Sequence, residues 1–368
     1  MINPLLLLTS LSFAAGIVAP VYVRDEQHET WSQLRVVVGS NFINSNAQNE
    51  LTMWQEETWD PITLQRELKY ASELGFNGVR VFLHNLLHEN DPEGLFGRME
   101  AFNDLCDKVN IGIIYVLLDS CWKPNPLNGT QPEPTPYVHN SVWMQSPGLD
   151  IVSDITVFNA TVKPYVSEVI SRFSSDPRII AWDVWNEPNN DNGHNDNEKI
   201  DFPALLSAVF EWAREANPSQ PITSPIWQGE NWDDYANLSE VQKIQINHSD
   251  IISFHNYEPL ELLATKVERL KTYEKPIICT EYMARKMNSY FNPNLGYMVG
   301  EGVSAMNWGL VTGKTQTCYP WDSNGEVNPY EGVEPEDLDW FHDILFADGT
   351  PKYPEEKEYI KLITGSIF

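Results

Sequence analysis

Two glutamates that follow short apolar segments are the residues of this sequence best suited to do chemistry together. Glu187 comes directly after Asn186 and the run 178–184, whose β-branched residues are typical of a buried strand. Glu281 follows a second such run, 275–280. A single glutamate after a strand is usually a solvated loop residue. Two carboxylic acids that end two parallel strands, however, meet at the same edge of a sheet, where barrel enzymes place their chemistry.

Hydrolysis of a glycosidic bond with retention of configuration needs such a pair of acids. One acid protonates the departing oxygen, and the second, about 5 Å away, attacks the anomeric carbon. Their pKa values must differ at the working pH. The sequence between Glu187 and Glu281 accommodates three further strand–helix units of about 30 residues each. We therefore expect the two acids on the fourth and seventh strands of an eight-stranded barrel.

Strand and helix signals alternate along the chain as such a barrel requires. The expected strands are 36–42, 78–84, 111–119, 178–184, 221–227, 250–257, 275–280 and 302–310. The expected helices include 61–74, 95–109, 202–216, 335–346 and 355–363. The first of these has Asp60 as N-cap and Pro61 at its first position. The predicted fold class is α/β, a single (β/α)8 TIM barrel formed by residues 20–368, with a long loop after its third strand.

The residues around both acids resemble a known group of enzymes. Trp-Asn-Glu-Pro at 185–188 resembles the acid/base strand of clan A glycoside hydrolases, and Thr-Glu-Tyr at 280–282 resembles their nucleophile strand. The similarity is greatest to family 5 and its close relatives, of the cellulase and mannanase type. The resemblance implies that Glu187 is the acid/base, Glu281 the nucleophile and Asn186 a ligand of the sugar 2-hydroxyl, with no cofactor and no metal ion.

Arg80 interrupts the apolar segment 78–84. Burying a guanidinium is costly unless a carboxylate or a similar partner neutralises it. A structural ion pair would explain Arg80 as well as a functional role does. The resemblance implies that Arg80 supports Glu281.

Aromatic and imidazole groups end the sixth and eighth expected strands. His255 and Tyr257 lie at alternating positions near the end of 250–257, and in an unknown protein they would be taken as core residues. The resemblance implies that Tyr257 hydrogen-bonds Glu281 and that His255 touches sugar. Trp308 ends the eighth strand and would form a flat apolar floor for a sugar ring, a role that the resemblance supports.

The loop after the third strand, from residue 121 to about 161, is rich in Pro, Asn and Gly. A loop of this length is uncommon unless it is functional. A sugar-binding cleft could be walled by Trp122, His139, Asn140 and Trp143, although a self-packed loop explains them nearly as well. Family 5 sequences usually carry a histidine near the end of this strand, and here Asp119 is expected to take over part of its role.

The charge of the chain excludes several partners. Lys and Arg number 24 and Asp and Glu 52, so the net charge is −28, which would repel nucleic acid and anionic membranes. The composition, 42% hydrophobic over 368 residues, is sufficient for one large core. We expect a carbohydrate substrate, no stable membrane partner and a monomer.

The first residues predict export. Residues 1–23 carry no charged side chain, and their apolar centre is followed by small residues, so 1–19 is interpreted as a secretory signal peptide cleaved after Gly16 or Ala19. A signal anchor is the alternative. The predicted location is secreted, and the acceptor triplets for N-glycosylation begin at Asn128, Asn159, Asn237 and Asn247.

The remaining motifs favour no metal site. The cysteines at 106, 121, 279 and 318 are too far apart for a zinc motif. Cys279 is expected to be a buried free thiol. The sequence does not decide whether one disulfide forms; a bond from 106 to 121 would close the shortest loop. The Asn-rich run 189–198 is interpreted as a solvated loop, because Pro188 stands where a calcium loop needs its first aspartate.

The predicted function is that of a secreted retaining β-glycoside hydrolase acting on a mannan, glucan or xylan type of substrate. A transglycosylase would share the same site, and a non-catalytic carbohydrate-binding wall protein could share the fold. Whether such an enzyme cuts chains internally or from an end is left open by these motifs.

Overall fold

The structure is a computed structural model that describes residues 21–26, 30–192 and 199–367. The predicted signal peptide, residues 1–19, lies outside the described residues. No helix within these ranges is both long and apolar enough to cross a membrane.

Eight parallel strands form the centre of the molecule, as expected for a (β/α)8 barrel. They are β3 (Val38–Asn41), β4 (Gly78–Phe82), β5 (Gly112–Val116), β6 (Ile179–Asp183), β7 (Ile222–Thr223), β8 (Ile252–Asn256), β9 (Ile277–Tyr282) and β10 (Ser304–Trp308). Their order around the sheet is β7-β6-β5-β4-β3-β10-β9-β8. The two outer strands approach each other through a parallel bridge between Ile226 and Phe254, which nearly closes the barrel. The predicted fold class is confirmed.

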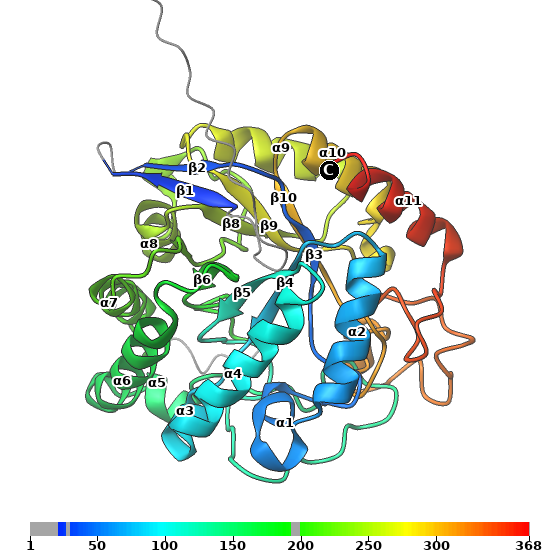
Figure 1. The fold of residues 1–368 in the computed structure, drawn as a ribbon, viewed down its shortest axis with the longest axis horizontal. Helices are drawn as coiled ribbons and strands as arrows, with labels where there is room; N and C mark the ends of the chain where they lie inside the picture. The colour runs from blue at the N-terminus through cyan, green and yellow to red at the C-terminus, as the bar shows by residue number, and fades with distance from the viewer. Residues whose placement is uncertain (1–20, 27–29, 193–198, 368) are drawn as a thin grey trace, which may run out of the picture.

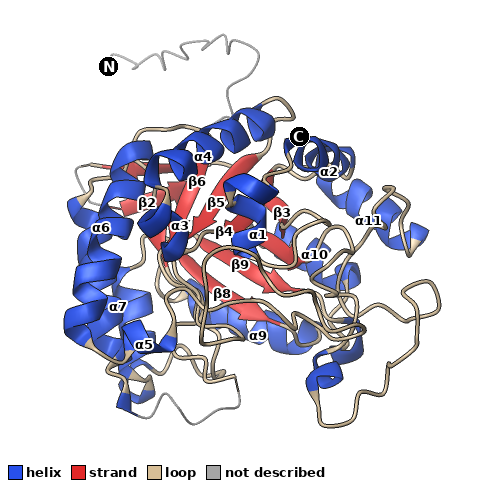
Figure 2. Cartoon of the chain, turned by 90° about the horizontal axis from the view of Figure 1, so that it is seen from below, coloured by secondary structure: helices blue, strands red, loops and turns tan. Residues whose placement is uncertain are grey.

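Helices surround the strands in both overall views (Figures 1 and 2). They are α1 (Glu50–Trp54), α2 (Pro61–Glu73), α3 (Asn85–Asn90), α4 (Pro92–Asp107), α5 (Leu149–Val152), α6 (Ile155–Phe173), α7 (Phe202–Glu215), α8 (Glu240–His248), α9 (Leu260–Lys271), α10 (Phe291–Gly300) and α11 (Pro354–Thr364). Helix α2 begins as its sequence predicts, because the Asp60 carboxylate accepts the backbone N–H of Thr63 at 3.0 Å.

A short antiparallel hairpin precedes the barrel and was not expected from the sequence. It consists of β1 (Tyr22–Asp25) and β2 (Thr30–Gln33). Val21 and Tyr22 belong to one buried cluster with Val37 and Ile251, which lie just before β3 and β8. The hairpin therefore packs at the amino-terminal end of the barrel strands, away from the two glutamates.

The predicted helix over 335–346 is wrong. The segment forms only a single turn at 335–337 and no helix. It bonds instead to the segment that follows β10: the N–H of Phe341 donates to the Cys318 carbonyl at 2.7 Å, and the N–H of Leu345 to the Leu310 carbonyl at 2.9 Å. Its Trp340 is fully buried. Apolar residues here cover a neighbouring loop, and these tertiary bonds replace the helix that Pro335 and the local pattern favoured.

The long loop after β5 is shorter than its composition indicated. Helix α6 begins at Ile155, six residues before the expected limit, because the Asp154 carboxylate accepts the N–H of Thr156 at 2.8 Å. No disulfide joins the cysteines, all four of which are free, and Cys279 is buried as predicted. Part of the Asn-rich run, residues 193–198, lies outside the described residues.

Candidate active site

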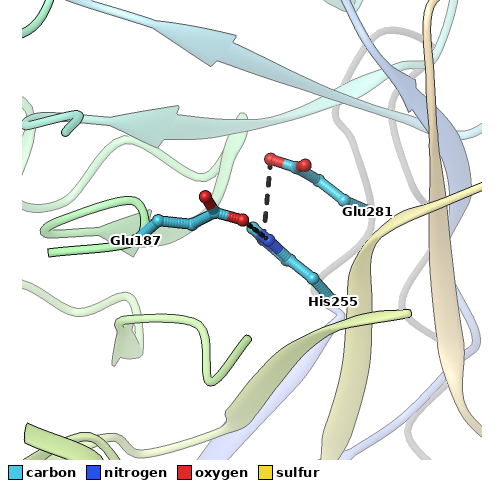
Figure 3. A group of neighbouring side chains, drawn as sticks. All are labelled: Glu187, His255 and Glu281. Atoms are coloured by element: carbon cyan, nitrogen blue, oxygen red, sulfur yellow. Dashed lines mark hydrogen bonds and ion pairs between the residues drawn. The ribbon is translucent and has the colours of Figure 1, made fainter. Parts of the chain in front are cut away.

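The two glutamates meet at the carboxyl end of the barrel. Glu187 follows β6, the fourth barrel strand, and Glu281 lies in β9, the seventh. One carboxylate oxygen of each acid and one nitrogen of His255 all lie within 4.8 Å of one another. Figure 3 shows the imidazole of His255 next to both carboxyl groups, with dashed lines to each. Residues 94 positions apart in sequence thus form a single cluster.

Glu281 is held by three side chains from other strands. Its Oε1 atom accepts a hydrogen bond from Arg80 Nη1 at 3.0 Å and its Oε2 from the Tyr257 hydroxyl at 2.7 Å. His255 Nε2 lies 3.5 Å from Oε1. Burial raises the pKa of Glu281 above its usual value, although the neighbouring His255 and Arg80 act to lower it. The cluster therefore supplies donors that favour an ionised Glu281.

Arg80 forms a structural ion pair and also contacts the residues of the site. Its side chain is fully buried and pairs with Asp183, also fully buried, at 2.7 Å. The same guanidinium donates to the Asn186 side-chain oxygen at 2.6 Å and to that of Asn41 at 2.7 Å. Because Arg80 also reaches Glu281, one buried cation orients both the amide beside the first acid and the carboxyl group of the second.

Glu187 has a different set of partners. Its Oε1 atom lies 2.7 Å from His255 Nδ1, and its Oε2 accepts from the Asn190 side-chain amide at 2.6 Å and from the Cys121 thiol at 3.3 Å. Burial raises the pKa of Glu187, and these two donors act to lower it. Glu187 also has a backbone φ of 45°, in the left-handed region that costs a non-glycine residue about 1–3 kcal/mol.

The position of His255 distinguishes the two acids. Burial lowers the pKa of His255 to about 4, so the ring is neutral at higher pH, with one nitrogen as donor and the other as acceptor. A protonated Glu187 can donate to Nδ1 at 2.7 Å while Nε2–H faces an ionised Glu281 at 3.5 Å. In this tautomer Nδ1 accepts a hydrogen bond, whereas Nε2–H makes none and only points its positive end toward Glu281. The arrangement corresponds to one acid with its proton and one without.

Within the described part of the chain, one group of His, Cys, Asp and Glu side chains could converge on a metal ion. It consists of Glu187, His255 and Glu281. Each acid already accepts a hydrogen bond from a protein donor, since Asn190 bonds Glu187 and Arg80 bonds Glu281. A divalent cation would compete with the positive charge of Arg80. The arrangement is suited to proton transfer without a metal.

A cleft of about 320 Å³ opens directly above the two acids. Its lining includes most of the residues that the sequence singled out: Asp119, Trp122, His139, Asn140, Asn186, Glu187, Tyr257, Glu281 and Trp308. Arg80 and His255 are buried beneath it and act on the acids instead. The structure thus brings all eleven of these residues to one place, including four from the long loop and the end of β5.

Asp119 occupies a position between the loop and the first acid. Its Oδ1 atom accepts from the Asn186 amide at 2.9 Å, and its Oδ2 from the Trp143 indole N–H at 2.8 Å. Burial raises the pKa of Asp119 to about 6. Asp119 therefore holds the side chain of Asn186 from one side while Arg80 holds it from the other.

Several contributors were not expected from the sequence as parts of the site. Asp183, Asn190 and Cys121 contact the acids or Arg80, and Trp227 and His342 line the cleft. Asn190 lies in a run that composition assigned to a solvated loop. The sequence indicates Cys121 only as a possible disulfide partner. Their proximity to the acids depends on how the loops fold back, for which no local pattern exists.

Removing a donor to Glu187 should change the pH dependence of activity in a defined direction. A hydrogen bond to a carboxylate stabilises its charged form, so Asn190→Ala and Cys121→Ala should both raise the pKa of Glu187. The alkaline limb of kcat/KM should then move to higher pH, and further for Asn190→Ala, because the amide is the shorter and stronger donor. Rate profiles from pH 4 to 9 would measure this, and a shift to lower pH in either variant would contradict it.

The structure is a nearly closed (β/α)8 barrel with two buried carboxylic acids at the ends of its fourth and seventh strands, beneath an aromatic cleft. This is the architecture of a glycoside hydrolase. The sequence profile described as Cellulase (glycosyl hydrolase family 5) matches residues 37–321. The chain belongs to glycosyl hydrolase family 5, and the family expected from the motifs around 187 and 281 is confirmed.

Solved structures share the fold at low sequence identity. A β-1,4-mannanase from the sea hare Aplysia kurodai is 13% identical with a TM-score of 0.54, over 76% of this chain and 90% of the mannanase. An exo-β-1,4-mannosidase from Opitutaceae bacterium strain TAV5 is 16% identical with a TM-score of 0.61, over 95% and 62%. A family 5 mannosidase from Rhizomucor miehei is 14% identical with a TM-score of 0.57, over 94% and 97%. Comparison with the curated proteins finds no match.

Proposed function

We propose that this glycoside hydrolase cleaves β-linked glycans with retention of configuration, with β-mannosides as the first substrates to test. The observation that best supports a retaining reaction is the distance between carboxylate oxygens of the two acids, which lie within 4.8 Å of each other. Retaining enzymes place their carboxyl groups about 5–5.5 Å apart, and inverting enzymes about 6.5–9.5 Å apart. The substrate preference is supported by the structural neighbours, which include mannanases and mannosidases.

The roles follow from the surroundings of each acid. Glu281 attacks the anomeric carbon as the bond from that carbon to the departing oxygen breaks, and the proton of Glu187 passes to that oxygen. Water then attacks the glycosyl ester, gives a proton to Glu187 and releases Glu281 as a carboxylate. Asn186, held between Arg80 and Asp119, is positioned to bond the sugar beside the reacting carbon.

The stereochemistry of the first product tests this proposal directly. The enzyme would be mixed with an aryl β-mannoside, and the anomeric proton of the released sugar would be followed by NMR before mutarotation. We expect the β anomer to appear first. Initial release of the α anomer would show inversion and refute the proposal, and no hydrolysis of β-mannosides, β-glucosides or β-xylosides would favour a binding protein on the same scaffold.

The pH dependence should reflect the raised pKa values of both acids. Glu281 must be ionised and Glu187 protonated, so kcat/KM should rise as Glu281 loses its proton and fall as Glu187 loses its own. Burial raises both pKa values, which places the optimum above the usual carboxyl range. Because the two acids interact, the two limbs of the pH profile report apparent pKa values of the pair and not of either residue alone. An activity that stays constant from pH 4 to 9 would contradict this assignment.

We also propose that the protein is secreted and glycosylated. The uncharged, apolar stretch 1–19 supports export, and the side chains at Asn128, Asn159, Asn237 and Asn247 are all exposed. Expression in a eukaryotic secretory host would test both points. We expect medium-borne protein whose sequence begins near residue 17 or 20 and whose mass falls on treatment with an endoglycosidase. Retention in the cell membrane would support the signal anchor instead.

A further inference from the structure

Three loops are joined into one continuous wall on one side of the cleft. We define the closing wall as residues 42–49 after β3, 131–145 after β5 and 311–324 after β10. Backbone hydrogen bonds cross between these segments: the N–H of Asn140 donates to the Thr315 carbonyl at 2.9 Å, and the N–H of Lys314 to the Ser45 carbonyl at 3.0 Å. The Asn49 amide reaches the Val142 carbonyl at 3.0 Å.

Gln316 is the side chain that fastens the middle of the closing wall. Its amide oxygen accepts the N–H of Tyr137 at 2.7 Å, and its amide nitrogen donates to the carbonyls of Thr135 at 2.7 Å and Val138 at 3.1 Å. The neighbouring His139 is 1% exposed, and its backbone N–H donates to the Ser323 hydroxyl at 2.9 Å. So many bonds between segments distant in sequence indicate a fixed barrier.

The inner surface of the closing wall leaves no passage for a second sugar. Trp143 and Trp308 line the cleft and pack against Phe82 with ring centroids 5.2 and 5.6 Å away. The void beyond these rings measures about 10 Å³, roughly the space of one water molecule. The cleft itself, at about 320 Å³, is at the small end of ligand-binding sites.

The position of Glu187 shows which part of the substrate meets the wall. A proton donor must lie within hydrogen-bond reach of the departing oxygen, so the leaving group passes on the Glu187 side. Asn190 and Trp227 line the cleft on that side. Trp308 stands on β10 and the closing wall lies behind it. The sugar enclosed between Trp308 and Glu187 is therefore the one that is released, and it has no room for a further sugar at its non-reducing end.

Building on the proposed function, we infer that the enzyme is exo-acting: it removes single sugars from the non-reducing ends of β-linked chains because the closing wall blocks internal binding. The ligand is a terminal, unsubstituted pyranose whose aglycone extends past Glu187. Nothing in the family assignment decides this point, since a family 5 barrel with an open groove would cut chains internally.

The test uses pentasaccharides of β-1,4-linked mannose, glucose and xylose, each reduced at its reducing end with borodeuteride. In whichever series is cleaved, the first products should be the free monosaccharide and a deuterium-labelled oligosaccharide shorter by one unit, as identified by mass spectrometry. Labelled mono- or disaccharides at the first turnover would show internal cleavage and overturn the inference. No hydrolysis of any series, or of aryl β-glycosides, would instead refute the proposed function on which the inference rests.

A loop variant tests whether the closing wall is the cause. Gln316→Ala removes three bonds that hold 131–145, and we expect the ratio of internal to terminal cleavage to rise by about tenfold, the effect of roughly one net hydrogen bond. Gln242→Ala is the matched control, since its side chain also joins two backbone groups but lies at α8. Equal ratios in the two variants would refute a role for the wall, and thermal unfolding would confirm that both fold.

Discussion

Glu281→Gln should lose turnover on every substrate, whereas Glu187→Gln should lose it selectively. In the proposed mechanism Glu281 supplies the attacking oxygen, for which a neutral amide is no substitute, so the loss of rate should be independent of the leaving group. In the same mechanism Glu187 supplies a proton, worth about 10²–10⁴-fold in rate. A dinitrophenyl leaving group departs without that proton. Formation of the glycosyl-enzyme should therefore be nearly normal in Glu187→Gln with this substrate and strongly slowed with an oligosaccharide.

Azide provides a second readout that separates the two roles. In Glu187→Ala, azide can replace water as attacking group without needing a base, and the product should be a β-glycosyl azide formed by retention. In Glu281→Ala, azide can enter the space of the missing nucleophile and should yield the α-glycosyl azide. The exposed Glu358→Gln on α11, outside the cleft lining, serves as control and should leave all rates unchanged. Substantial oligosaccharide hydrolysis by either acid variant, or the opposite azide products, would show that the roles are misassigned.

Arg80→Met should produce the largest loss of stability among single substitutions at the site. Arg80 and Asp183 are both fully buried, so removing the guanidinium leaves a buried carboxylate without its cation. Breaking such a pair costs about 3–5 kcal/mol. The same change withdraws the donor at 3.0 Å from Glu281, so activity should fall as well. Urea unfolding at pH 7 would measure the free energy of unfolding.

The pH dependence and a double variant identify the cause of that loss. Burial already raises the pKa of Asp183 although Arg80 acts to lower it, and without Arg80 it rises further. The destabilisation is therefore greatest at neutral pH and is relieved as pH falls and Asp183 gains a proton. Arg80→Met combined with Asp183→Asn should recover part of the stability but not the activity. Arg214→Met removes a pair with Asp250 in which the arginine side chain is 44% exposed, and it should cost less than about 1 kcal/mol. Equal losses for Arg80→Met and Arg214→Met would contradict the buried-charge argument.

The elements that carry the acids were predictable because their signals are local. Strand β6 is marked by the β-branched residues Ile179 and Ile180, and α2 by the cap Asp60 with Pro61 after it. Each of these signals lies within a few adjacent residues. The predicted helix 335–346 does not form, because Pro335 is only a local helix signal. The hydrogen bonds that this segment makes to 310–318 outweigh it.

The alternation of strands and helices and the pair of acids at two strand ends can be recognised from the sequence alone, and the barrel and the family follow from them. Folding of the whole chain places His255 between the acids, lets Arg80 bond both Asp183 and Glu281, and joins three loops on one side of the cleft. Most of these contacts join residues about 70 to 270 positions apart, and no periodicity encodes them. They exist because barrel closure brings the carboxyl ends of distant strands together, and burial there obliges each polar group to find a partner.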